Sequence, residues 1–135
     1  MSGEWSVVSG DVAIQSFKDL DVWQLAMKLA GACYVVTRKF PKEEMYGMTS
    51  QIRRAATSIP ANIAEGYGRD QTGSFIQFLR IAQGSARELE THLLLAEQIE
   101  LLTSEIAKLL HLDCERVSKM LRALIRSLEA RRDSL

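Results

Sequence analysis

Apolar residues recur at alternating intervals of three and four along four stretches of the chain, the spacing of one face of an α-helix. No stretch has the period of two that is typical of a β-strand. Because short connections favour antiparallel packing, the pattern predicts an all-α fold, an up-down-up-down antiparallel four-helix bundle over residues 17–130. Its helices are expected at about 20–40, 44–67, 72–102 and 104–130. Residues 1–16 are expected to form a flexible N-terminal arm, and residues 131–135 a frayed tail.

Proline and glycine positions set the expected ends of these helices. Pro41 ends the first helix, because its ring disfavours a helical conformation in the residue before it. Pro60 lies inside the second helix and is expected to bend it. Gly66 and Gly68 offer a left-handed stop to that helix.

The first helix carries two apolar stripes. The first stripe runs through Leu20, Trp23, Met27, Ala30, Tyr34 and Thr37, and the second contains Leu25, Ala26, Leu29, Cys33 and Val36. The third helix likewise has apolar residues outside a single seam, namely Leu94, Leu95 and Leu101. A soluble monomer rarely leaves such wide stripes exposed, so the pattern predicts a homo-oligomer.

Charge is balanced overall and unevenly distributed. The 135 residues include 17 basic and 17 acidic ones, which argues against a protein that coats nucleic acid indiscriminately. Five arginines lie within residues 51–87, whereas residues 88–105 contain five glutamates and no Lys or Arg. The candidate ligand-binding residues are Arg53, Arg54, Arg69, Arg80 and Arg87, whose guanidinium groups suit a phosphate backbone or an acidic protein surface. Alternatively, they pair with Glu65, Glu88, Glu90 and Glu97 across subunits.

A strip of polar residues follows the seam between the second and third helices. Its members are Ser58, Asn62 and Glu65 on one helix and Ser85, Glu88 and His92 on the other. Buried polar groups usually serve packing specificity, so the strip is expected to form a hydrogen-bonded network that sets helix register.

Reactive groups that would support catalysis are sparse. Glu88 and His92 lie one helical turn apart, with Glu65 as a conceivable third ligand, but the chain contains no Glu-x-x-His pair of the di-iron bundles. Neither a GxSxG elbow nor a phosphate-binding glycine loop occurs. We therefore expect no catalytic residue, no cofactor, no metal site and no small-molecule substrate.

Apolar run lengths and cysteine positions bear on cellular location. No run reaches the eighteen or so residues that span a bilayer, and acidic residues occupy the place of a signal peptide's positive charges. Cys33 and Cys114 lie far apart in apolar surroundings and are expected to be buried thiols. A cytoplasmic protein without a membrane partner is the expectation.

Three segments, FKDLDVWQLA, RRAATSIPANIAEGYGR and FLRIAQGSARELETHLLLA, carry a family resemblance. In their order and spacing, over about residues 17–128, the chain resembles a bacterial family of four-helix bundles. The family is known for ribosomal-RNA intervening-sequence proteins and is related to the accessory variability determinant of diversity-generating retroelements. The resemblance implies a homopentameric ring with a non-enzymatic accessory role, in which basic residues contact nucleic acid and a partner reverse transcriptase.

Residues that match the family segments lie in the second and third predicted helices. They are Arg53, Ser58, Asn62, Glu65 and Gly66 in the second and Arg80, Ser85, Glu88 and Glu90 in the third. The chain departs from the retroelement accessory proteins in charge, because they are distinctly basic and it is neutral.

The leading hypothesis is a cytoplasmic, non-catalytic, homo-oligomeric scaffold that binds RNA or a nucleoprotein through the five arginines. A second hypothesis is a self-assembling protein-interaction module without a nucleic-acid ligand, whose charges are neutralised between subunits. A third is a metal-binding bundle that uses Glu65, Glu88 and His92.

Overall fold

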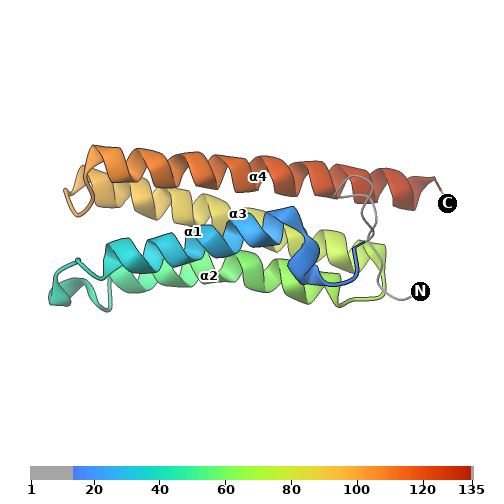
Figure 1. Ribbon diagram of the computed structural model, residues 1–135, viewed down its shortest axis with the longest axis horizontal. Helices are drawn as coiled ribbons and strands as arrows, with labels where there is room; N and C mark the ends of the chain where they lie inside the picture. The colour runs from blue at the N-terminus through green and yellow to red at the C-terminus, as the bar shows by residue number, and fades with distance from the viewer. Residues whose placement is uncertain (1–13, 135) are drawn as a thin grey trace.

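Four long helices form the protein in a computed structural model that describes residues 14–134 (Figure 1). They are α1 (Asp21–Thr37), α2 (Met48–Tyr67), α3 (Thr72–Gln98) and α4 (Ser104–Asp133), with short 3₁₀ turns η1 (Phe17–Asp19) and η2 (Lys42–Glu44). Each helix runs antiparallel to the next, and α1 packs on both α2 and α4 while α3 packs on both as well. No strand occurs within residues 14–134, so the predicted all-α four-helix bundle is confirmed.

The connection between α1 and α2 is longer than the sequence suggested. Helix α1 ends at Thr37, and residues 42–44 form the η2 turn, so α2 begins only at Met48. The Glu44 carboxylate nevertheless acts at the start of α2, where its Oε1 accepts a hydrogen bond from the Met48 amide at 3.2 Å. An acidic group there suits the positive end of the helix dipole.

Gly66 serves close packing and does not supply a left-handed stop. A Cβ at Gly66 would lie 2.7 Å from the Phe78 Cβ and 3.0 Å from Phe75 Cδ1, so only glycine lets α2 approach α3 here. Gly68, which ends α2, has a φ of −73°.

The left-handed position belongs to Glu100, with a φ of 65°, just after α3. There the Leu101 amide donates to the Ala96 carbonyl at 2.8 Å and the Glu100 amide to the Glu97 carbonyl at 3.0 Å, which is a Schellman motif. Helix α3 therefore ends at Gln98, before the expected residue 102.

At both ends of residues 14–134, packed or helical structure extends beyond the predicted limits of the bundle. Of the predicted arm, residues 1–13 lie outside the described residues, but Ile14 is fully buried and its carbonyl accepts a hydrogen bond from the Tyr67 hydroxyl at 3.3 Å. Ser16 caps η1 through its side chain. At the other end, α4 continues to Asp133 and includes part of the predicted tail.

The core-facing side of α1 takes residues from both of the stripes seen in the sequence. Val22, Ala26, Leu29 and Cys33 are buried, together with Ala30 and Thr37. In the first stripe Leu20 is also fully buried, whereas Met27 and Tyr34 are 46% and 39% exposed, so each stripe is buried only in part. Within residues 14–134 no helix is both long and apolar enough to cross a membrane.

Candidate functional site

Three adjoining hollows lie along the outer side of α2, and Thr57 lines all of them. They measure about 350 Å³ beside α1, about 430 Å³ beside α3, and about 310 Å³ toward the start of α2. Small side chains on α2, such as Ala61, leave this space open. We name the whole depression the α2 groove; its main lining residues are Trp23, Met27, Tyr34, Tyr46, Arg53, Arg54, Thr57, Ala61 and Glu88.

Two of the five candidate arginines line this groove. The Arg53 guanidinium lies over the Tyr34 ring, 4.5 Å from its centroid, and its Nε donates to Thr37 Oγ1 at 2.9 Å. Arg54 is exposed, and its guanidinium forms no hydrogen bond or ion pair within residues 14–134. Neither arginine forms an ion pair with a carboxylate of the described chain, so both remain available to an anion.

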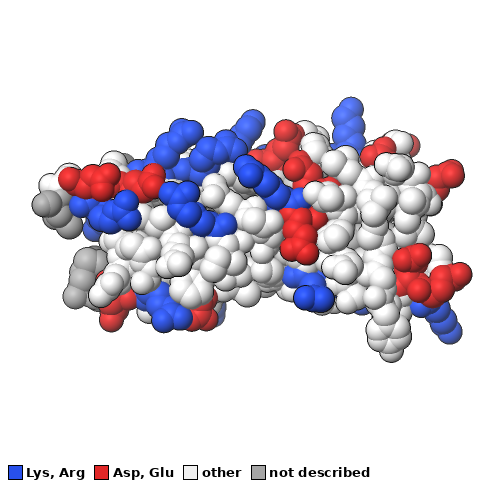
Figure 2. All heavy atoms as spheres, turned by 180° about the vertical axis from the view of Figure 1, so that it is seen from behind, with Lys and Arg blue, Asp and Glu red and all other residues white. Residues whose placement is uncertain are grey.

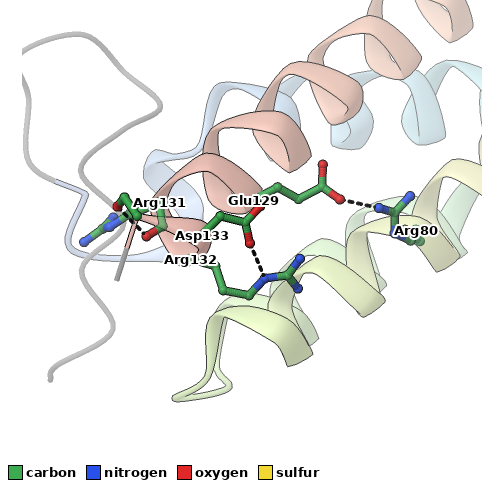
Figure 3. A network of polar contacts seen from close by, with 6 residues as sticks. Arg80, Glu129, Arg131, Arg132 and Asp133 are labelled. Carbon is green, nitrogen blue, oxygen red and sulfur yellow. Dashed lines mark hydrogen bonds and ion pairs between the residues drawn. The ribbon is translucent and has the colours of Figure 1, made fainter.

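Two other candidate arginines are neutralised within the chain. Arg69 Nη2 lies 2.8 Å from Glu65 Oε2 on the same helical face, and the Arg69 guanidinium also covers the Phe78 ring at 4.9 Å. Figure 3 shows Arg80 of α3 reaching toward Glu129 of α4, with 2.6 Å between Nη2 and Oε2. Half-exposed pairs of this kind contribute at most about 1 kcal/mol, and they leave little free charge for a ligand.

Arg87, the fifth candidate, is exposed on α3 and forms no ion pair within residues 14–134. It does not line the α2 groove. Seen from behind, most basic side chains lie over the half of the molecule that holds the C-terminal part of α4, while the opposite half has few basic side chains and several acidic ones at its edge (Figure 2). The groove arginines are thus only part of the positive surface.

The predicted polar network is assembled from three of its six members. Ser58 Oγ and Ser85 Oγ lie 2.8 Å apart and join α2 to α3. The Asn62 side-chain amide donates to the Ser58 carbonyl at 2.8 Å and to its hydroxyl at 3.0 Å. Glu65 pairs with Arg69 instead, and Glu88 lies 56% exposed at the edge of the groove. The network holds the seam between α2 and α3 beneath the groove.

The two histidines each face a carboxylate. His92 Nε2 lies 3.5 Å from Glu88 Oε2, and His111 Nδ1 lies 3.2 Å from Glu90 Oε2, both without hydrogen-bond geometry. Glu65 does not join His92, since its carboxylate is turned to Arg69. In the described part of the chain, no three His, Cys, Asp or Glu side chains converge as metal ligands.

Both cysteines are buried free thiols in the core. Burial raises the pKa of each thiol to about 12, and the neighbouring Cys33 adds to the rise at Cys114. A thiol with such a pKa stays protonated at neutral pH and is a poor nucleophile or metal ligand.

Residues 18–123 match the family model of the 23S rRNA-intervening sequence protein. The chain belongs to this family. A crystal structure of an S23 ribosomal protein family member of unknown function, from Bacteroides thetaiotaomicron VPI-5482, is similar at 29% sequence identity and a TM-score of 0.70. That similarity covers 77% of this chain and 97% of the Bacteroides chain. No curated protein matches the chain.

The family match includes the whole α2 groove of this 23S rRNA-intervening sequence family member, from Trp23 to Glu88. It ends before Glu129, the partner of Arg80. The groove is thus built from the part of the chain that family members share.

Three aromatic residues of the groove, Trp23, Tyr34 and Tyr46, were missed as site residues from the sequence. The first two lie in an apolar stripe of α1, which predicted packing contacts and no ligand. Tyr46 lies in the connection between η2 and α2, where periodicity gives no signal. Its position before Gly47, in a turn, was the one available hint.

Proposed function

We propose that this member of the 23S rRNA-intervening sequence family is a non-enzymatic, homo-oligomeric scaffold that binds RNA, free or within a nucleoprotein, in the α2 groove. The observation that carries the proposal is the position of Arg53 and Arg54, two cations that line a groove and have no carboxylate partner among residues 14–134. Guanidinium groups bind phosphate oxygens through two parallel hydrogen bonds, which suits them to a nucleic-acid backbone.

The neutral overall charge fits a confined binding site better than a coating activity. With 17 basic and 17 acidic residues, long-range attraction of a polyanion is weak, so contact depends on the local charge of the groove. Arg69 and Arg80, which the sequence also nominated, are given a structural role in this proposal because each already holds a carboxylate.

Subunit association is proposed to involve the end of the molecule formed by α3 and α4. Large apolar side chains are between 37% and 66% exposed there, and we name them the α3–α4 tip: Leu94, Leu95, Ile99, Ile106, Leu109 and Leu112. Such a patch favours burial against another copy, and the family resemblance implies five copies in a ring. The unpaired thiols Cys33 and Cys114 fit a reducing compartment such as the cytoplasm.

Binding of a fluorescently labelled, structured RNA, followed by anisotropy across salt concentrations, tests the proposal. Arg54→Ala should weaken binding and reduce the salt slope by about 1 for each occupied groove, because one phosphate contact is lost. Arg126→Ala is the matched control, since Arg126 is exposed on α4, which does not contact α2. Equal effects of the two variants, or no binding by the unmodified protein at low salt, would refute the groove as an RNA site.

The second candidate function is a protein-interaction module without a nucleic-acid ligand, and the apolar α3–α4 tip favours it. In that case the arginines serve contacts between subunits. Light scattering after size-exclusion chromatography separates the two functions, because Arg54→Ala would then change the subunit number and leave no RNA binding to measure.

A further inference from the structure

Tyr46 is the most exposed large apolar side chain within residues 14–134, at 96%. It lies between η2 and α2 and lines the hollow of about 310 Å³ at the start of α2, together with Tyr34. An aromatic ring gains much free energy from burial, yet Tyr46 adds almost no packing to this protomer. Its ring is therefore available to a ligand.

Beside these rings, the Arg53 guanidinium is held in place before any ligand arrives. The guanidinium stacks on the Tyr34 ring, and its Nε donates a hydrogen bond to the Thr37 hydroxyl. That hydroxyl in turn donates to the Cys33 carbonyl at 2.7 Å, which fixes its position. The two terminal nitrogens of Arg53 have no partner in the described part of the chain. A side chain ordered in advance loses less conformational entropy when it binds an anion.

The lining of this hollow has an excess of positive charge, because it includes Arg53 and Arg54 and no carboxylate. Residues 34–57 contain five basic residues and two acidic ones, Glu43 and Glu44. Glu44 accepts a hydrogen bond from the Met48 amide, and neither glutamate lines the hollow. The ligand that this charge favours is an anion, and the two exposed rings call for one with flat apolar faces.

Unpaired RNA has both properties. Each base offers a π-face on which an aromatic ring can stack, and each nucleotide offers a phosphate to a guanidinium. A duplex keeps its base faces inside the helix, so it presents phosphates to Arg53 and Arg54 but nothing for Tyr46 to stack on.

We propose that the α2 groove binds unpaired RNA bases, which stack on Tyr46 and Tyr34 while Arg53 and Arg54 contact the flanking phosphates. This inference rests on the proposed function and adds that the strand in the groove is single. Tyr46 and Tyr34 then set the preference for unpaired over paired RNA, and the arginines set the dependence on salt.

The test compares two RNAs and two variants at one exposed position. A labelled single-stranded RNA of about 12 nucleotides and a duplex of the same length are titrated with the protein and its variants. Tyr46→Leu should weaken single-strand binding about tenfold, since one stacking contact is lost, and leave duplex binding unchanged. Tyr46→Phe keeps the ring and should bind like the unmodified protein. Both variants should fold, because Tyr46 is exposed, and circular dichroism checks this.

The possible outcomes separate this inference from the proposed function. If neither RNA binds the unmodified protein at low salt, the proposed function fails and this inference with it. If RNA binds but Tyr46→Leu affects neither form, or both forms equally, only the stacking inference is overturned. If Tyr46→Leu changes the subunit number in light scattering, the ring belongs to a contact between copies, which also overturns it.

Discussion

The seam between α2 and α3 differs from the α3–α4 tip. Contacts within one protomer explain the residues of the seam more fully than those of the tip. In the seam, the absence of a side chain at Gly66 leaves room for Phe78, and the Ser58 hydroxyl is hydrogen-bonded to the Ser85 hydroxyl. At the tip, Leu109 is 66% exposed and Glu100 adopts a left-handed conformation that glycine would adopt at less cost. The seam is thus complete within one protomer, whereas the tip exposes apolar side chains that a second copy would cover.

The largest effect is expected from a charge placed in the tip. Leu109→Glu should convert the proposed homo-oligomer to single subunits at micromolar concentration, because an unpaired carboxylate would be buried in the contact between copies. Mass is measured by light scattering after size-exclusion chromatography. Ala130→Glu, an exposed position near the other end of α4, is the control and should leave the assembly intact. An unchanged mass for Leu109→Glu would show that the tip is no contact between copies.

The next largest effect is expected in the seam. Gly66→Ala should lower the free energy of unfolding by about 1–3 kcal/mol, because the new methyl group would meet Phe78 and push α2 from α3. Gly84→Ala is the matched control, since nothing lies within 4 Å of a Cβ there, and it should raise stability by about 0.5–1 kcal/mol. Urea unfolding measures both, and a Gly66→Ala protein as stable as Gly84→Ala would contradict the close approach.

A smaller loss is expected from the polar link across the seam. Ser85→Ala removes the hydrogen bond to Ser58 and should cost about 1 kcal/mol, because Ser58 still accepts from Asn62 and is not left unpaired. Ser118→Ala on α4, whose side chain has no hydrogen bond to another helix within residues 14–134, should change stability by less than about 0.5 kcal/mol. If Ser85→Ala costs no more stability than Ser118→Ala, the hydrogen-bonded network does not stabilise the seam.

The smallest effect is expected at the turn of the tip. Glu100→Gly should raise the free energy of unfolding by about 0.5–1 kcal/mol, since glycine adopts a φ of 65° without the strain of a Cβ. Gln98→Gly, two residues earlier and inside α3, should lower it by a similar amount. Thermal unfolding is the measurement. A destabilising Glu100→Gly would mean that the Glu100 side chain has a role, such as a contact between copies.

The fold was largely predictable because its signal is local. The 3.6-residue period and the proline and glycine positions are read from neighbours in the chain, and they predicted the four helices. The ends of the helices depended on contacts that the hydrophobic period does not reveal. The η2 turn delayed α2, and the left-handed residue proved to be Glu100, which no glycine signalled.

The candidate site was predicted only in part. Arg53 and Arg54 were among the candidates, as were Ser58, Asn62 and Ser85, which the structure brings together. The aromatic residues of the groove were not. Trp23 and Tyr34 share the helical period of the buried residues of their stripe, so the sequence alone had no means to show which members stay at the surface.

By itself, the sequence determined an all-α chain of four amphipathic helices, balanced in charge and with five arginines within residues 51–87. Only the tertiary structure decided which arginines keep a free charge. Arg80 meets Glu129, which lies 49 positions away in the chain, whereas Arg54 meets no carboxylate among residues 14–134. The reason is physical: helix formation depends on residues a few positions apart, but the partner of a charge depends on which helix faces are brought together by packing.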